Sequence, residues 1–111
     1  MINDVTNKKP YEIYKGLDLK LAEKIQRRRL QILVHSCIYY QMDQNIVTDF
    51  QYNSWAKELE ELQGKYPDIS KNVKWAKEFE NYSSSTGFNL PVTDPWVMNK
   101  AKQLLMYKGL A

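Results

Sequence analysis

Apolar residues recur with helical spacing over most of this chain. Between about Leu17 and Met42, one apolar line follows the i, i+3, i+4, i+7, i+8 period of a helix face. It consists of Leu30, Leu33, Val34, Cys37 and Ile38. A thinner line on the other side of the same helix consists of Leu21, Ile25, Ile32 and Tyr39. A helix that is apolar on two sides is expected to pack on both, or to pack on one and bind on the other.

A polar connector at residues 43–48 leads to a second predicted helix. Thr48 and Gln51 have the three-residue spacing of a capping box, which marks the start of this helix. Its apolar face consists of Tyr52, Trp55, Ala56, Leu59 and Leu62. Gly64 is expected to cap its C-terminus, and Pro67 is expected to prevent any continuation.

Two further helices are predicted in the C-terminal part of the chain. Ser70 is the expected N-cap of the first, with Val73, Ala76 and Phe79 facing inward. A loop without regular period occupies residues 81–91. Asp94 and Pro95 then begin the last helix, as an acidic cap followed by proline in the first turn. The inward stripe of this helix consists of Val97, Ala101, Leu104 and Leu105, and Gly109 ends it.

These patterns predict an all-α fold, an antiparallel helical hairpin extended by two further helices. The length of 111 residues favours one domain. We expect a loose N-terminal arm at residues 1–16 and a single helical domain at 17–111, with the hairpin at 17–67 and the C-terminal extension at 68–111. A single cysteine permits no internal disulfide and fits a reducing cytosol. Without a secretory segment or a long apolar run, the expected location is cytoplasmic, with no membrane span.

The charged and reactive residues predict no catalytic centre. The run Arg27–Arg29 points in three directions on a helix, so it is interpreted as a solvated face, and nucleic acid is disfavoured as a partner. The chain has one histidine, which excludes a metal site built on imidazoles. It has no glycine-rich loop of the kind that binds phosphate. Cys37 is interpreted as a core residue, and the acidic pair Glu60–Glu61 as solvent-facing.

Residues 35–67, HSCIYYQMDQNIVTDFQYNSWAKELEELQGKYP, carry a more specific pattern. A helix ends in the pair Tyr39–Tyr40, a connector follows, and DFQYN at residues 49–53 opens the next helix. The tail is LEEL at residues 59–62, with Pro67 after it. This order resembles the N-terminal helical subdomain of bacterial NAD-dependent DNA ligases, which grips the nicotinamide mononucleotide half of NAD.

The resemblance implies a cofactor-binding role for five residues. Tyr39 and Tyr40 match a pair in which an aromatic or imidazole ring packs on the nicotinamide. Asp49 matches an aspartate that holds the nucleotide, and Tyr52 matches a tyrosine that lines the same pocket. Asn53 stands where the ligases carry a second aspartate that is important for adenylation. An amide cannot complement the cationic nicotinamide ring as a carboxylate does. In the alternative interpretation, the tyrosines are core and flank aromatics and Asp49 is only a helix cap.

The nucleophilic Lys-x-Asp-Gly of the ligases does not occur in this sequence. The chain also resembles small ligase-related proteins of bacteriophages and prophages, through STGF at residues 85–88 and the dipeptide Pro95–Trp96. The first functional hypothesis is therefore a non-catalytic phage-type module that binds nicotinamide mononucleotide or NAD, without a metal. The second is a protein-interaction scaffold that modulates a host enzyme or defence system and has no small-molecule ligand. A nucleic-acid accessory that uses Arg27–Arg29 and the lysine-rich arm ranks behind both.

Overall fold

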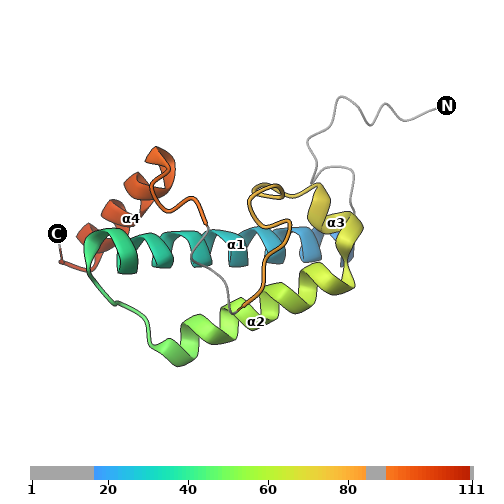
Figure 1. Ribbon diagram of the computed structural model, residues 1–111, viewed down its shortest axis with the longest axis horizontal. Helices are drawn as coiled ribbons and strands as arrows, with labels where there is room; N and C mark the ends of the chain where they lie inside the picture. Colours follow the sequence, from blue (N-terminus) through green and yellow to red (C-terminus); the bar gives the residue numbers. More distant parts are fainter. Residues whose placement is uncertain (1–16, 85–89, 111) are drawn as a thin grey trace.

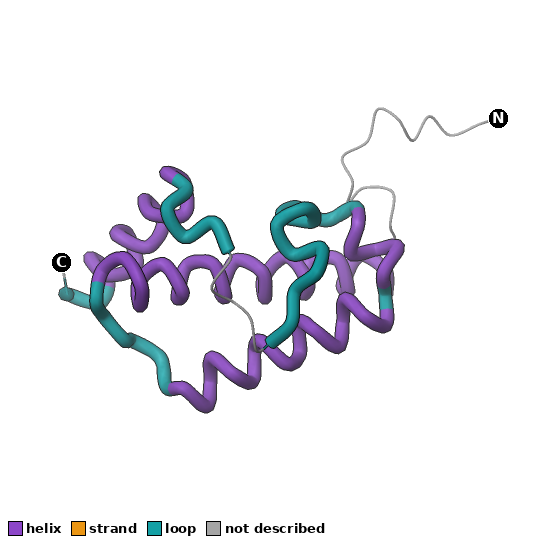
Figure 2. Tube along the Cα trace, viewed as in Figure 1, coloured by secondary structure: helices purple, strands orange, loops and turns teal. Residues whose placement is uncertain are grey.

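The structure of the protein, a computed structural model, describes residues 17–84 and 90–110. Its helices are α1 (Leu17–Met42), α2 (Asp49–Lys65), α3 (Pro67–Lys71) and α4 (Pro95–Tyr107). No strand occurs in the described ranges, as Figure 2 shows, and the predicted all-α class is confirmed. The expected arm at residues 1–16 and the STGF motif at 85–88 lie outside the described residues.

The hairpin of α1 and α2 forms as predicted. The two helices run in opposite directions, pack against each other and are joined by the connector at residues 43–48 (Figure 1). Thr48 caps α2, because its side-chain oxygen accepts a hydrogen bond of 3.0 Å from the backbone N–H of Gln51. Ala56 and Leu59 of α2 are fully buried against α1. The capping signal and the apolar face therefore place α2 correctly.

The last helix, α4, also forms as predicted and packs on α1. The Asp94 carboxylate accepts hydrogen bonds from the backbone N–H groups of Trp96 at 2.8 Å and Val97 at 3.2 Å. The residues of α4 that are buried are Val97, Ala101 and Leu105, whereas Leu104 is half-buried. Because α2, α3 and α4 all contact α1, the central helix packs on both of its apolar sides (Figure 1).

The end of α2 differs from the prediction. Gly64 lies inside the last turn, the helix continues to Lys65, and Tyr66 is the C-cap residue. The backbone N–H of Tyr66 donates to the carbonyl oxygen of Leu62 at 2.8 Å. Pro67 then begins α3, since a proline at the first helical position removes an N–H that has no partner there anyway.

The predicted helix after Ser70 does not form. Ser70 is buried inside the short α3, where its hydroxyl donates to the carbonyl oxygen of Tyr66 at 2.8 Å. Residues 72–81 form a bend and a series of turns. Val73 and Phe79 are nevertheless buried, as their apolar character predicts, and Ala76 is half-buried. The apolar positions were correct and the helical path between them was wrong.

A buried arginine of α1 explains this departure. The Arg29 guanidinium donates to the backbone carbonyl oxygens of Ser70 at 2.9 Å, Val73 at 3.0 Å and Lys74 at 3.1 Å, and to the side-chain oxygen of Gln63 at 2.8 Å. In a continuing helix, those carbonyls would accept from N–H groups four residues later. Arg29 is 1% exposed, and burial lowers its pKa to about 10, so it remains cationic at neutral pH.

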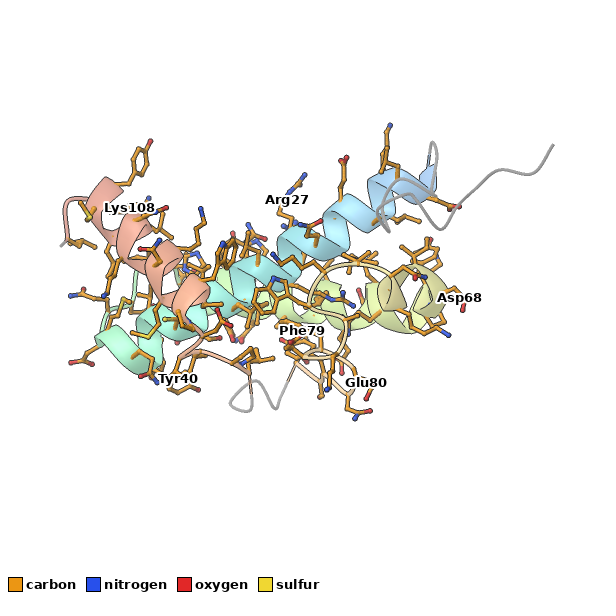
Figure 3. All side chains as sticks on the ribbon, turned by 90° about the horizontal axis from the view of Figure 1, so that it is seen from above. Arg27, Tyr40, Asp68, Phe79, Glu80 and Lys108 are labelled. Atoms are coloured by element: carbon orange, nitrogen blue, oxygen red, sulfur yellow. The ribbon has the colours of Figure 1, made fainter. Side chains whose placement is uncertain are left out.

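The solvated-face interpretation of the arginine run therefore holds only for Arg27, which is exposed and points away from the helices in Figure 3. Arg28 is hydrogen-bonded to the carboxylate of Glu58, which also pairs with Lys24 at 2.8 Å. Arg29 organises the core, so the three neighbours have three different roles. Within the described residues, no helix is both long enough and apolar enough to cross a membrane.

Candidate functional site

A pocket lies at the connected end of the hairpin, between the last turns of α1, the connector and the first turn of α2. Its volume is about 150 Å³. Its lining consists of His35, Ser36, Ile38, Tyr39, Tyr40, Gln44, Asn45, Ile46, Val47, Asp49 and Tyr52. Four of the five residues predicted to bind the cofactor are in this lining.

The connector forms one wall of the pocket because of the way α1 ends. Asp43 has a φ of 52°, in the left-handed region. Aspartate tolerates this region better than most residues, since its short polar side chain can form local hydrogen bonds. The backbone N–H of Gln44 then returns to the carbonyl oxygen of Ile38 at 3.1 Å. This turn brings residues 44–47 back beside the end of α1.

Tyr39 and Tyr40 are adjacent aromatic side chains of the pocket lining. Their ring centroids are 4.9 Å apart and their planes are almost perpendicular, at 85°. Tyr39 is 56% exposed and Tyr40 is 57% exposed. Tyr40 lies near the edge of the molecule at the end of α1 (Figure 3). Neither ring is a core residue, so both retain surface that a ligand can contact.

Tyr52 joins the pocket to the core. It is half-buried, packs against the core cluster, and its hydroxyl lies 2.7 Å from the Ser36 hydroxyl in a hydrogen bond. Burial raises the pKa of Tyr52, so the phenol stays protonated at neutral pH. The hydrogen bond and the packing together hold this ring in a fixed orientation at the pocket wall.

Among the described residues that line the pocket, Asp49 is the one carboxylate, and none is a lysine or arginine. It is exposed and occupies the first turn of α2, where the helix dipole favours negative charge. The N-cap of α2 is Thr48, so the alternative in which Asp49 itself caps the helix is wrong. Its carboxylate gives the pocket a negative charge.

Asn53 does not share this pocket. It lines a separate hollow with Phe50, Trp55, Glu58 and other side chains. Successive residues of an α-helix are about 100° apart around the axis, so Tyr52 and Asn53 face different directions. The resemblance alone did not distinguish these two faces of α2.

His35 also lines the pocket, although it is not among the residues predicted to bind the cofactor. Its ring centroid lies 5.3 Å from that of Trp55, and its Nδ1 is buried without a hydrogen-bond partner in the part of the chain that the structure describes. Burial, together with the nearby charge of Lys108, lowers the pKa of His35, so the imidazole is neutral at pH 7. The sequence could have indicated that His35 belongs to the pocket, because it precedes Tyr39 by four positions and therefore shares its helix face.

The other reactive side chains lie elsewhere. Cys37 is fully buried, and burial raises the pKa of its thiol, in agreement with the predicted core role. Glu60 and Glu61 are exposed as predicted. Among the described residues, no group of three His, Cys, Asp or Glu side chains could hold a metal ion. The pocket itself offers aromatic faces beside one carboxylate, an arrangement that suits a flat cationic ring.

Comparison with known proteins agrees with this location. Residues 18–72 match the family model described as "DNA ligase-like, N-terminal NAD+-binding domain". A DNA ligase of Thermoanaerobacter pseudethanolicus is 38% identical over 47 residues, which are 42% of this chain and 7% of the ligase. A DNA ligase of Citrifermentans bemidjiense is 35% identical over 49 residues, 44% of this chain and 7% of the ligase.

The matched part of the chain thus spans about 7% of the length of these curated relatives. No solved structure matches the chain. The matched segment contains all of the pocket lining and most of α1. Residues 18–72 are therefore similar to the NAD+-binding domain found at the N-terminus of DNA ligases.

Proposed function

We propose that this protein is a non-catalytic, phage-type module that binds the nicotinamide ring of nicotinamide mononucleotide or NAD in the pocket between α1 and α2. One observation carries the proposal. Tyr39, Tyr40, Asp49 and Tyr52 line a single pocket, and this pocket lies in the segment that is similar to an NAD+-binding domain.

The volume of the pocket is suited to a nicotinamide ring and is too small for a whole dinucleotide. A cavity of about 150 Å³ is large enough for benzene, whereas sites for drug-sized ligands occupy about 300–1,000 Å³. The nicotinamide ring would therefore enter the pocket. The ribose and phosphate groups would remain outside it.

The negative charge of the pocket favours binding of the oxidised form of the nicotinamide ring. An oxidised nicotinamide nucleotide carries a positive charge on the ring, and the reduced form does not. Asp49 attracts such a charge and the tyrosine faces add a cation–π contribution, while no lysine or arginine stands among the described residues of the lining. The charge of Lys108 near His35 opposes this attraction in part. The pocket is thus expected to prefer the oxidised ligand.

The absence of catalysis is a separate part of the proposal. The sequence contains no Lys-x-Asp-Gly nucleophile to accept AMP from NAD. Incubation with NAD should leave the mass of the protein unchanged in mass spectrometry. A mass increase equal to AMP would show that the protein is an enzyme.

Ligand-induced thermal stabilisation tests the binding itself. A ligand at a hundred times its dissociation constant should add about 2.7 kcal/mol to the free energy of unfolding. Oxidised nicotinamide mononucleotide and NAD should stabilise the protein. Reduced nicotinamide mononucleotide should do so less, and ADP-ribose, which lacks the ring, should have no effect.

A pair of matched variants of α2 tests the role of charge by isothermal titration calorimetry. At an effective dielectric constant near 20, two unit charges about 4 Å apart attract by roughly 4 kcal/mol before desolvation. Because Asp49 is exposed, we expect about 1 kcal/mol of this attraction to remain. The substitution Asp49→Asn should therefore lower the affinity for the oxidised ligand by up to about tenfold. Affinity for the reduced ligand should not change.

Asn53→Asp is the control, because it adds a carboxylate in the neighbouring hollow and not in the pocket. It should leave both affinities nearly unchanged. Equal losses for the oxidised and reduced ligands in Asp49→Asn would indicate a change of shape and contradict the charge argument. If oxidised nicotinamide mononucleotide does not bind at millimolar concentration, the proposal fails. The protein-interaction scaffold, with Phe50 as an exposed aromatic contact, then takes its place.

A further inference from the structure

A second aromatic surface lies where the turns after α3 meet the start of α4. It consists of Lys74, Trp75, Trp96 and Lys100, and is named here the Trp–Lys patch. The two indole rings are 5.9 Å apart between centroids, at an angle of 45°. The Lys74 ammonium lies 5.0 Å from the Trp96 ring centroid and 5.6 Å from that of Trp75, and the Lys100 ammonium lies 5.4 Å from the Trp96 ring.

The Trp–Lys patch is open to solvent. Trp96 is 39% exposed, both lysines are exposed, and Trp75 is half-buried. Trp96 and Lys100 are four residues apart on α4, so they share one face of the helix. None of the four residues lines the pocket described above, so the two surfaces are separate.

The charge around the Trp–Lys patch is mainly positive. Between Pro95 and Lys108 the chain carries three lysines and no acidic residue. On the side of Trp75, residues 71–80 carry three lysines and two acidic residues, Glu78 and Glu80. Next to Trp96 the acidic neighbour is Asp94, and its carboxylate is engaged by the backbone N–H groups of Trp96 and Val97. An anion that approaches Trp96 would therefore meet two ammonium groups that have aromatic partners and lie within reach of solvent.

The backbone at Trp75 provides a second, independent observation. Trp75 has a φ of 73°, in the left-handed region that bulky residues rarely occupy. Such a conformation persists only where surrounding contacts impose it, and these positions cluster at functional sites. Directly before it, Arg29 holds the carbonyl oxygens of Val73 and Lys74. The fold thus places the Trp75 ring beside Trp96 against the local preference of the residue.

We propose that the Trp–Lys patch is a stacking platform for single-stranded nucleic acid. An unpaired base would stack on the Trp96 ring, while Lys74 and Lys100 would contact the flanking phosphates. Exposed aromatic rings combined with cationic side chains bind single strands in this way, with little dependence on sequence. A duplex is a poor ligand for this surface, because its bases are already stacked on each other. This platform differs from the Arg27–Arg29 run, two of whose members are engaged inside the fold.

Fluorescence anisotropy with a labelled oligothymidylate of about 12 nucleotides tests the proposal, since single-strand sites span about 4–16 nucleotides. The full chain is titrated at about 50 mM salt and then at rising salt. Oligothymidylate should bind more tightly than a duplex of equal length and more tightly than polyglutamate. Equal binding of polyglutamate would show that the surface attracts anions without stacking, and would overturn the proposal.

Two sets of variants separate stacking from charge. Trp96→Ala should weaken oligothymidylate binding roughly 5- to 150-fold, the range for loss of one stacked base, and Trp96→Phe should retain most of the affinity. The double variant Lys74→Gln, Lys100→Gln should reduce the magnitude of the salt slope by about 1.4, from about 0.7 for each phosphate contact to a single strand.

Phe50→Ala and Lys102→Gln are the matched controls. Phe50 is an exposed aromatic residue of α2, and Lys102 is an exposed lysine of α4. Both variants should bind oligothymidylate like the parent, and all variants are compared by thermal melting to confirm the fold. If oligothymidylate fails to bind the parent at low salt, the proposal is wrong. It is also wrong if Trp96→Ala and Phe50→Ala lose affinity equally.

Discussion

The strongest structural prediction concerns the buried Arg29. We propose to compare the parent with Arg29→Met, which retains an unbranched side chain of similar reach and removes every hydrogen-bond donor. Four acceptors lose the donor that Arg29 provides, namely three backbone carbonyl oxygens and the side-chain oxygen of Gln63. The variant should be strongly destabilised, and the turns after α3 should lose their arrangement first.

The expected magnitude follows from how far each acceptor is buried. The hydrogen bonds to the carbonyl oxygens of Ser70 and Val73 are buried, so water cannot replace the lost donor. An unsatisfied buried acceptor costs about 1–3 kcal/mol. The Val73 carbonyl oxygen loses its donor, whereas the Ser70 carbonyl oxygen keeps a long hydrogen bond of 3.5 Å from the backbone N–H of Val73, so the cost for the two together is roughly 2–4 kcal/mol. Removal of the desolvated guanidinium offsets part of this cost. A net loss of about 1–3 kcal/mol remains, out of about 5–15 kcal/mol for a typical domain.

Urea denaturation followed by far-UV circular dichroism measures this loss. In a parallel thermal melt, the melting temperature should fall by roughly 5–20 °C, since 1 kcal/mol corresponds to about 4–8 °C in a domain of this size. Arg27→Met is the matched control, because Arg27 is an exposed arginine of the same helix, and it should change the free energy of unfolding by less than about 0.5 kcal/mol. Equal free energies of unfolding for the two variants would refute the assignment of Arg29 as the organiser of residues 70–74.

Three further predictions test other contacts. Leu105→Ala should lower the free energy of unfolding by about 2–5 kcal/mol, because Leu105 is 4% exposed. Leu104→Ala should lower it by less, because Leu104 is half-buried. Equal losses for the two variants in urea denaturation would contradict this. Tyr52→Phe removes a 2.7 Å hydrogen bond to a serine of α1 and should destabilise by about 1 kcal/mol, with no loss if the bond does not form in solution. Hydrogen bonding from Lys24, assisted by an arginine of α1, holds the pKa of Glu58 below its ordinary value of 4.5, so its stabilising effect should be fully present above pH 4.5 and disappear as pH falls through the lowered pKa. Glu58→Gln should flatten this part of the stability curve, and a curve identical to that of the parent would exclude the effect.

The parts of the fold that the sequence predicted are those set by local signals. The limits of α1 follow from its apolar period, and the starts of α2 and α4 follow from capping by Thr48 and Asp94. Each of these signals lies within a few residues of the boundary that it determines. The physical cause and the structural result are then close together in the sequence, so periodicity and capping rules suffice.

The helix predicted after Ser70 failed because its determinant is distant in sequence. Ser70, Val73 and Phe79 have helical spacing, but Arg29 precedes Ser70 by 41 positions and binds the carbonyl oxygens that a helix would use. An arginine on the central helix normally indicates a solvated position, because arginine is rarely fully buried without partners. Here the partners are backbone groups, which no residue pattern displays.

The site was predicted in part for a similar reason. Tyr39, Tyr40, Asp49 and Tyr52 were named from a motif, and the structure places all four in one pocket. Asn53 was assigned to the same site because it follows Tyr52 in that motif, although a helix turns it toward another hollow. Adjacency in a motif is not adjacency in space. The helical angle between two residues must be considered before both are assigned to one site.

The two candidate surfaces share one physical feature. In the part of the chain that the structure describes, the non-glycine residues with positive φ are Asp43 and Trp75. Asp43 begins the connector that forms one wall of the pocket, and Trp75 contributes a ring to the Trp–Lys patch. Neither is a glycine, so composition gives no sign that the backbone turns there. Each conformation is disfavoured locally and must be held by contacts elsewhere, such as those that Arg29 makes beside Trp75. The two left-handed residues thus lie at the two candidate surfaces, and each surface depends on a backbone turn.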